Sequence, residues 1–247
     1  MQSLYANTWN EAIKLLLQTK TKLALAAAAL VPVLAAIWFG RLANGLGLSL
    51  GRDFPLLMLD LFASILFPLF LFMAAAESFS GEYAAGTIQL VLLRPSTRAA
   101  AFAGKVLALI AYAALLLAVV WVVSVAAGLA LDARTTLAGL PDSLIAYAAC
   151  FVAMAAVACT AAFVAQWVRS GVGALALCVI LYVAAKLLTL AYPQAAVWSL
   201  FAYTDWHALW TGGAVAAGTL LHSFLFLLSG GTIMYTAGWF MFERKSF

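Results

Sequence analysis

Charged side chains are scarce in this chain. Only 9% of its 247 residues are Asp, Glu, Lys or Arg, whereas 67% are hydrophobic and the mean hydropathy is +1.08. Soluble globular domains carry roughly 25% charged residues, so the composition excludes that class. The apolar runs are long enough for helices that cross a bilayer, which takes about 20 residues. Because these runs are continuous rather than alternating, an outer-membrane barrel is also excluded. The sequence predicts an all-α, multi-pass membrane protein.

Residues that carry out chemistry are equally rare. The two histidines, His207 and His222, are too far apart in the sequence for the H-E-x-x-H zinc motif. Cys150, Cys159 and Cys178 stand alone in apolar stretches without a C-x-x-C pair, so we expect small core residues rather than a metal site or a disulfide. The nucleophile motif G-x-S-x-G is missing as well. We therefore expect no catalytic residue, cofactor or metal on this chain.

A phosphate-binding loop is also missing. That loop needs G-x-x-x-x-G-K-[ST], because a glycine-rich turn holds the phosphates while Lys and Ser or Thr reach phosphate and Mg²⁺. The nearest approach, at 104–106, has neither the hydroxyl nor the upstream glycine. If ATP drives this protein, a separate subunit must bind ATP and Mg and hydrolyse the nucleotide. No basic stripe interleaved with aromatics indicates a nucleic acid partner.

Apolar runs and their punctuation predict six transmembrane helices. They cover residues 23–39, 56–76, 99–131, 143–166, 171–192 and 214–242. The third is longer than a bilayer requires, so we expect it to tilt or protrude. Together the spans and their connections form a single transmembrane domain over residues 1–247.

The distribution of cations predicts the orientation. With the N-terminus in the cytoplasm, six crossings return the C-terminus to the same side. Nine cations then face the cytoplasm: Lys14, Lys20, Lys22, Arg94, Arg98, Lys105, Arg169, Arg244 and Lys245. Four lie at or near the outer face: Arg41, Arg52, Arg134 and Lys186. This bias agrees with the positive-inside rule.

The N-terminal segment, 1–21, has an amphipathic pattern. Tyr5, Trp9, Ile13 and Leu16 recur at helical spacing, and polar residues fall mostly on the other side. We expect a helix that lies in the plane of the lipid headgroups with Trp9 as its anchor. A simple topogenic anchor is the alternative.

A polar stretch, EYAAGTIQLVLLRPSTR at 82–98, interrupts the apolar sequence after the second span. An acidic residue, Gly-Thr, an aliphatic run, Pro and Arg follow one another here, and Lys105 opens the third span. This pattern resembles the signature of ABC-2-type transporter permeases. The rest of the chain, with its N-terminal helix and six spans, resembles the short permeases of bacterial bacitracin, lantibiotic and multidrug ABC exporters.

The resemblance implies that 77–98 forms a cytoplasmic coupling helix that docks on an ATPase subunit. The residues expected to carry this role are Glu77, Glu82, Gly86, Thr87, Ile88, Val91, Leu92, Arg94, Pro95 and Arg98. The spacing of Ile88, Val91 and Leu92 gives a short apolar face, and Pro95 ends the element. The alternative is a topogenic loop whose arginines only hold the orientation.

Two charges inside predicted spans stand out. Asp60 and Lys186 each lie about 8–9 Å below the outer edge, given 1.5 Å per residue. A charge at mid-bilayer costs at least about 2.5–3.5 kcal/mol, which makes intramembrane charges functional candidates. Equal depth and opposite sign suggest an ion pair. In the alternative, Lys186 snorkels outward and Asp60 meets water near the surface.

The connection between the last two spans, 193–213, is dense in aromatic residues. They are Trp198, Phe201, Tyr203, Trp206 and Trp210, together with Tyr192. Amphipathic rings favour the membrane interface, so the composition predicts an interfacial belt. Resemblance to ABC-2 permeases implies short re-entrant helices that form an outer gate.

The resemblance as a whole implies the membrane subunit of an ATP-driven exporter in a bacterial inner membrane. Its expected partners are an ABC ATPase, the lipid bilayer, and a second permease copy or a paralogue. The expected cargo is amphiphilic: a peptide antibiotic, a hydrophobic drug or a lipid-linked molecule. A non-transporting scaffold or sensor subunit and an ion-coupled secondary transporter are the alternatives.

Overall fold

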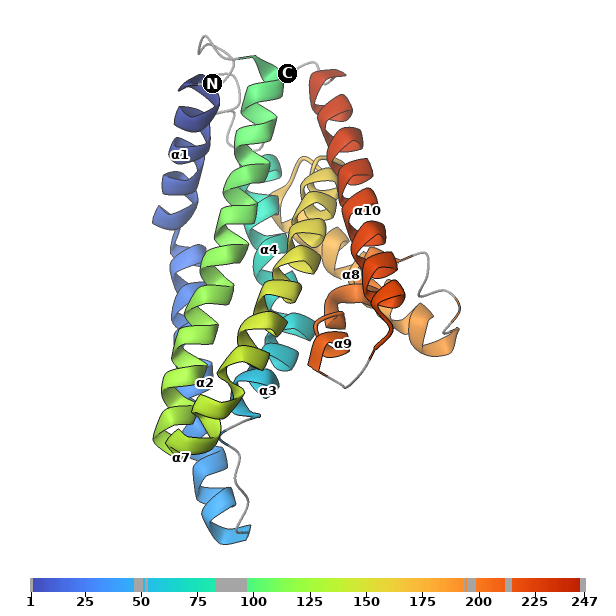
Figure 1. Ribbon diagram of the computed structural model, residues 1–247. Coiled ribbons are helices and arrows are strands. Elements are labelled where there is room, and N and C mark those ends of the chain that lie inside the picture. The colour runs from blue at the N-terminus through green and yellow to red at the C-terminus, as the bar shows by residue number, and fades with distance from the viewer. Residues whose placement is uncertain are drawn as a thin grey trace.

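The chain is a bundle of long helices (Figure 1). The computed structural model describes residues 2–46, 51, 53–82, 97–192, 194, 199–211 and 215–244. Its main helices are α1 (Gln2–Leu17), α2 (Thr19–Leu46), α3 (Phe54–Leu61), α4 (Phe67–Ala76), α7 (Arg98–Ala165), α8 (Gly171–Ala191), α9 (Ala208–Thr211) and α10 (Ala217–Arg244). The described residues also form two π-helical turns, η1 (Phe62–Leu66) and η2 (Glu77–Gly81), and a 3₁₀ helix, η4 (Leu200–Asp205). No strand occurs in the described ranges, so the all-α prediction is confirmed.

Five of the described helical segments are long and apolar enough to cross a membrane. They are Thr19–Arg41, Phe54–Gly81, Arg98–Ala165, Gly171–Ala191 and Ala217–Arg244. Four overlap predicted spans one for one, and the fifth, α7, contains two of them. The protein is therefore a multi-pass membrane protein.

Helix α7 is a hairpin of two antiparallel arms. A straight helix of its 68 residues would be about 100 Å long, roughly three times the hydrocarbon core. The backbone leaves the helical region at Asp132, with φ −156° and ψ 100°. The hydroxyls of Ser124 and Tyr147 lie 3.3 Å apart, although 23 residues of straight helix would separate them by about 35 Å. In Figure 1 the first arm (green) descends and the second (yellow) returns beside it.

The connection between these two arms is shorter than predicted. Residues 133–142, expected as a loop, are helical. The carboxylate of Asp132 accepts hydrogen bonds from the backbone N–H groups of Arg134 and Thr135, at 3.1 and 3.3 Å. Such bonds satisfy free N–H groups at a helix start, so the second arm begins directly after one non-helical residue. The predicted spans, which end at residue 131 and resume at 143, had left a longer break.

A continuous rod of α3, η1, α4 and η2 runs through the middle of the bundle and extends to Gly81, five residues beyond the predicted span. Its buried side chains are mostly large and apolar: Phe54, Leu59, Phe62, Phe67, Leu71 and Phe72. Near the middle of the rod, Phe72 packs edge to face against Tyr182 of α8 and Phe201 of η4, with ring centroids 5.8 and 5.9 Å away. The rod is thus fixed by aromatic contacts to the elements around it.

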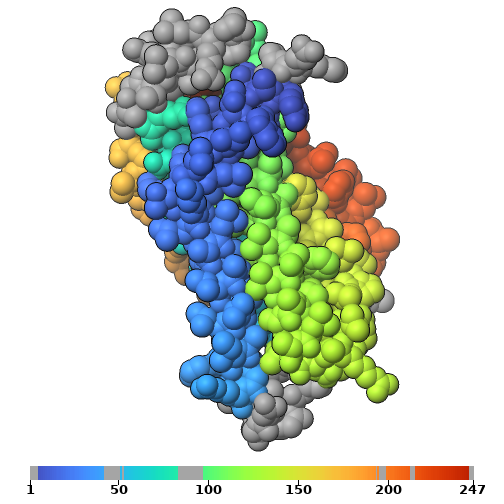
Figure 2. All heavy atoms as spheres, turned by 90° about the vertical axis from the view of Figure 1, so that its left-hand side faces the viewer, coloured from blue at the N-terminus to red at the C-terminus, as the bar shows by residue number. Residues whose placement is uncertain are grey.

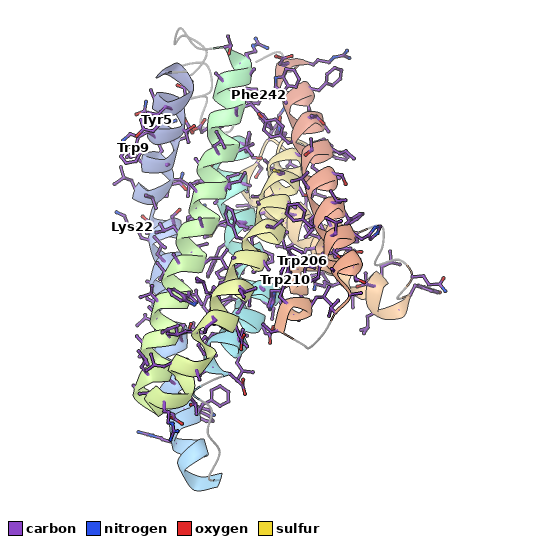
Figure 3. All side chains as sticks on the ribbon, in the orientation of Figure 1. Tyr5, Trp9, Lys22, Trp206, Trp210 and Phe242 are labelled. Atoms are coloured by element: carbon purple, nitrogen blue, oxygen red, sulfur yellow. The ribbon has the colours of Figure 1, made fainter. Side chains whose placement is uncertain are left out.

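Helix α1 does not lie across the bundle. It runs parallel to the first arm of α7: a Cβ on Gly104 would lie 3.2 Å from the Cβ of Asn7, and about two turns further on Leu15 and Tyr112 line the same small cavity. Figure 2 shows α1 and α2 (blue) covering one side of that arm (green). The predicted amphipathic face is present, with Tyr5 and Trp9 73% and 59% exposed (Figure 3). The prediction of a helix flat in the headgroup plane is corrected, because close packing at Gly104 aligns α1 with α7.

Both described ends of the chain lie at one end of the bundle. The start of α1, the start of α7 and the end of α10 meet there (Figure 1). A guanidinium nitrogen of Arg98 donates to the backbone carbonyl of Glu243 at 3.0 Å. This end, called the terminal end below, also contains the start and the finish of the segment predicted to couple to an ATPase.

Candidate functional site

A buried lysine forms the centre of the terminal end. The side chain of Lys105 is only 1% exposed, yet its ammonium group has three acceptors. It donates to Glu82 at 2.7 Å, to Glu11 at 3.0 Å and to the backbone carbonyl of Ser78 at 3.0 Å. An ammonium group has three N–H donors, so this set satisfies all of them.

A second lysine completes the arrangement. Lys14 donates to Glu11 at 2.8 Å and to Glu82 at 3.1 Å, so two lysines and two carboxylates alternate. Glu11, Lys14, Glu82 and Lys105 are called the Lys105 cluster here. The four charges sum to zero, which reduces the cost of burying them.

The two ionisable groups that α1 contributes are tuned by the cluster. Burial alone raises the pKa of Glu11, but the charge of Lys105 and the hydrogen bonds from both lysines outweigh it, and the pKa lies below 4.5. Burial alone lowers the pKa of Lys14, but the hydrogen bond to Glu11 and the charge of Glu82 raise it above 10.5. In both groups, the opposite charges and hydrogen bonds favour the ionised form in the folded protein.

Local structure delivers each member of the cluster. Glu11 and Lys14 are three residues apart, so they project from one face of α1. The π-helical turn η2 ends at Gly81 and leads directly to Glu82, while the carbonyl of Ser78 within it points to Lys105. Gly104 lets α1 approach α7 closely, because an added Cβ would lie 3.3 Å from the backbone nitrogen of Thr8.

The segment predicted to couple to an ATPase is held at both ends. Glu77 accepts from Lys20 of α2 at 2.6 Å, and Glu82 joins the Lys105 cluster. At the other end, the hydroxyl of Thr97 caps the start of α7 by accepting from Ala100 at 3.2 Å, and Arg98 reaches the end of α10. The remaining predicted residues lie outside the described residues: Gly86, Thr87, Ile88, Val91, Leu92, Arg94 and Pro95.

The opposite end of the bundle holds a second polar cluster, and it corrects a prediction. Asp60 and Lys186 each bond to a different partner. The ammonium of Lys186 donates to Asp205 at 2.7 Å, and Nε2 of His207 lies 2.7 Å from a carboxylate oxygen of Asp60. Ser64 also donates to Asp205, at 3.0 Å. Within the described part of the chain, these contacts replace the direct Asp60–Lys186 pair.

The second cluster, called the Asp205 cluster, consists of Asp60, Ser64, Lys186, Asp205 and His207. It fastens the η4–α9 region to the central rod and to α8. The carbonyl of Ser64, inside the π-helical turn η1, accepts from the hydroxyl of Tyr182 at 2.6 Å. A π-helical turn displaces backbone groups from the regular pattern, and such turns are frequent at functional sites.

The aromatic residues of the η4–α9 region divide into two groups. Phe201 and Trp206 are 9% and 3% exposed and pack inside the bundle, so they do not form the predicted interfacial belt. The ring of Phe201 contacts those of Phe72 and Tyr182, and the ring of Trp206 contacts that of Trp210. Trp210 itself is 42% exposed, as a belt residue would be, and Tyr203 packs on Phe226 with ring centroids 4.9 Å apart. Trp198 lies outside the described residues.

Sequence reasoning missed four charged or titratable members of these clusters. Glu11 and Lys14 were placed on the polar side of an amphipathic helix, and Lys14 was also counted among the cytoplasmic cations. His207 had been considered for zinc and then set aside, and Asp205 had been overlooked. The available signal was the position of Asp205 and His207, two titratable residues that stand two apart in an otherwise aromatic and apolar stretch.

The other chemistry-bearing residues are buried or dispersed. Cys150, Cys159 and Cys178 are free and buried, which confirms their prediction as core residues. In the ranges that the structure describes, no three His, Cys, Asp or Glu side chains come together as metal ligands.

Long apolar helices with charges paired at both ends of the bundle define a multi-pass membrane protein. Over residues 8–185, well over half of the chain, the sequence matches the model of a family described as ABC-2 family transporter protein. The chain belongs to this family and is an ABC-2-type permease, the membrane component of an ABC transporter. Comparison with curated protein sequences gave no match.

Proposed function

We propose that this permease is the transmembrane subunit of an ATP-driven exporter. It crosses a bacterial inner membrane six times with both termini in the cytoplasm. Three observations support this topology: the α7 hairpin, the meeting of the described chain ends at one end of the bundle, and the excess of cations there. A separate ABC subunit binds ATP and Mg and hydrolyses the nucleotide, and two permease copies, or this chain and a paralogue, pair in the membrane.

The Lys105 cluster is the observation that carries the proposed coupling. Through Lys105, Glu82 is bonded to α1, to the first arm of α7 and to η2. When the ATPase subunits close, they displace the segment, and this displacement reaches the bundle at Glu82. Because Lys105 is buried and fully bonded, its contacts transmit movement better than solvated charges do.

The central rod extends the coupling to the opposite end. Toward one end of the rod, the carbonyl of Ser78 accepts from Lys105. Toward the other end, Asp60 and Ser64 belong to the Asp205 cluster. Ser64 and Ser78 are 14 residues apart, about 21 Å along a helix. We propose that the η4–α9 region acts as the outer gate and that the rod moves it. An amphiphilic cargo then leaves outward along the interface between the two permeases.

Co-purification with an ABC ATPase encoded beside this chain tests the proposal. The charge reversal Arg94→Glu, inside the coupling segment, is compared with Arg244→Glu, at the end of α10 where the guanidinium lies over the ring of Phe240 at 4.0 Å. Both positions are cytoplasmic in the proposed topology. Glu82→Arg is a poorer choice, because Glu82 supports the fold through Lys105.

Wild type and Arg244→Glu are expected to retain the ATPase. At equal membrane insertion, Arg94→Glu is expected to co-purify with at least tenfold less ATPase. Equal retention by both variants would show that the segment is not the docking site. If the wild-type chain retains no ATPase with or without nucleotide, the exporter proposal fails. A scaffold, a sensor or an ion-coupled transporter would then replace it.

A further inference from the structure

The central rod contains two π-helical turns, η1 and η2, and in each of them a side chain from outside the rod bonds to a backbone carbonyl. In η1 the hydroxyl of Tyr182 donates to the carbonyl of Ser64 at 2.6 Å. In η2 the ammonium group of Lys105 donates to the carbonyl of Ser78 at 3.0 Å. In an α-helix each of these carbonyls would accept from the backbone N–H four residues further on. The reason for the replacement differs between the two turns.

The sequence itself fixes η1 in its π-helical form. Four residues after Ser64 stands Pro68, which has no N–H and whose ring would clash with that carbonyl in a regular helix. The backbone N–H of Phe67 bonds five residues back, to the carbonyl of Phe62. Tyr182 supplies the donor that the proline lacks. Removal of the tyrosine hydroxyl therefore cannot turn η1 into an α-helix.

No such obstacle exists in η2. The residue four after Ser78 is Glu82, which has a backbone N–H, and residues 77–82 contain no proline. That N–H donates to the carbonyl of Phe79, three residues back, while Lys105 bonds to the carbonyl of Ser78. The α-helical donor for Ser78 is thus present but bonded elsewhere. The contact that keeps η2 out of the α-helical pattern is the one from Lys105.

Lys105 holds η2 through two charge-assisted bonds. The same ammonium group that bonds to the carbonyl of Ser78 also bonds to the carboxylate of Glu82, at 2.7 Å. Hydrogen bonds from an ionised donor are roughly twice as strong as neutral ones, so Ser78 gains more from Lys105 than from a backbone N–H. The π-helix is rare and the α-helix is the usual form, so η2 is expected to become α-helical once Lys105 is released.

This conversion would displace the residues that follow the turn. A π-turn holds one residue more than an α-helical turn, so each later residue moves by one position when the turn tightens. One position corresponds to a rotation of about 100° and a rise of about 1.5 Å. At a helix radius of about 5–6 Å, the rotation moves the side chain of Glu82 by about 8 Å and takes it away from Lys105. The two bonds from Lys105 are therefore lost together.

We infer that η2 is a two-state switch: it is π-helical while Lys105 holds Ser78 and Glu82, and α-helical when Lys105 is released. Gly81, which ends the turn, gives the backbone freedom for this change. The turn η1 does not take part, because Pro68 keeps it π-helical in both states. A role of the switch in coupling rests on the proposed function, since η2 leads into the segment expected to dock on the ATPase. The switch itself is a property of the chain alone.

Disulfide formation to position 171 distinguishes the two states. A Cβ on Gly171 would lie 3.8 Å from the Cα of Gly81, so cysteines at these positions are close enough for a disulfide, and both glycines have a backbone conformation that other residues adopt. In the α-helical state Ser80 takes the place of Gly81. Gly81→Cys with Gly171→Cys (the 81/171 pair) thus reports the π form, and Ser80→Cys with Gly171→Cys (the 80/171 pair) reports the α form.

Both pairs are made in the full chain in lipid nanodiscs, without an ATPase, and disulfides are quantified by mass spectrometry of peptides after mild oxidation. With Lys105 present, the 81/171 disulfide is expected to dominate. Lys105→Met is expected to raise the ratio of 80/171 to 81/171 about tenfold, which is the difference between a charge-assisted and a neutral hydrogen bond. Tyr182→Phe is the matched control, because it removes the outside donor of η1, and it should leave the ratio unchanged.

A proline variant separates a switch from general loosening. Glu82→Pro copies the arrangement in η1, since a proline then stands four residues after the bonded carbonyl. It removes a carboxylate from Lys105, yet in the native background it is expected to abolish the minor 80/171 product. Added to Lys105→Met, it is expected to restore the 81/171 disulfide. Persistence of the 80/171 product in either proline variant would overturn the inference.

Three other results would also overturn the inference. An unchanged ratio in Lys105→Met would show that Lys105 does not hold η2. Loss of the 81/171 disulfide without a gain of 80/171 would show that the end of the rod frays instead of tightening. An equal shift in Tyr182→Phe would show that the whole rod loosens. Because no ATPase is present, these outcomes concern the switch alone, and co-purification tests the exporter proposal separately.

Discussion

Replacement of Lys105 by methionine is the most informative perturbation of the terminal end. Methionine keeps most of the length of the side chain and removes the ammonium group. Three acceptors then lose their donor: Glu82, Glu11 and the carbonyl of Ser78. Lys14 still donates to the two carboxylates, whose side chains are 18% and 13% exposed.

The expected cost follows from the burial of these groups. Removing one partner of a fully buried ion pair costs about 3–5 kcal/mol, since the other charge stays buried without compensation. The carboxylates here are partly exposed, and Lys14 remains 2.8 and 3.1 Å from them. We therefore expect Lys105→Met to lower the free energy of unfolding by about 2–4 kcal/mol.

The measurement is unfolding of the purified chain in mixed micelles, followed by circular dichroism as the SDS fraction rises. Lys22→Met is the matched control, because Lys22 is exposed on α2 (Figure 3), and it should change stability by less than about 0.5 kcal/mol. The double variant Lys105→Met/Glu82→Gln removes one charge of each sign. It is expected to be more stable than Lys105→Met alone.

Two results would refute this reasoning. If Lys105→Met costs no more than Lys22→Met, the cluster is solvated and does not fasten the coupling segment to the bundle. If Glu82→Gln destabilises Lys105→Met further, the charge of Glu82 is compensated elsewhere, and the alternating arrangement is not what makes the cluster stable.

Three further predictions concern the remaining contacts. The pKa of Glu11 is lowered and that of Lys14 is raised, so their stabilising contributions persist between pH 4.5 and 10.5. Glu11 loses its contribution as pH falls through its folded pKa, and Lys14 as pH rises through its own; pH titration of unfolding in wild type and Glu11→Gln checks this. Gly104→Ala should cost about 1–3 kcal/mol by pushing α1 away, whereas Gly218→Ala, with open space around it, should be neutral or stabilising by thermal melting. Asp205→Asn should weaken the attachment of the η4–α9 region, seen as faster hydrogen exchange there and unchanged exchange in α1, and uniform exchange would contradict it.

Features that depend on local sequence were predicted well. Long apolar runs fix where transmembrane helices form, because a helix satisfies its own backbone polar groups inside a bilayer. Helix α8 begins at the predicted residue, Gly171, where the hydroxyl of Ser170 caps it by accepting from the backbone N–H of Gly173. The turn at Asp132 was predicted less well, since polar residues mark a connection without showing how few of them it needs.

Pairing between distant residues was predicted only in part. Glu82 and Lys105 were singled out by one motif, and the structure bonds them. Asp60 and Lys186 were placed at the same depth, and both do lie in the Asp205 cluster. Depth along a helix follows from counting residues, but it does not identify which side chain lies opposite.

By itself, the sequence determined the class of the protein, the positions of its apolar helices and the family motif after the second span. The tertiary structure alone decided that Glu11 meets Lys105, 94 residues away, and that Asp60 meets His207, 147 residues away. The physical reason is packing. Gly104 allows α1 to align with α7. Asp205 at the end of η4 and His207 just after it reach Lys186 and Asp60, so they supply the partners that these two side chains would otherwise have found in each other.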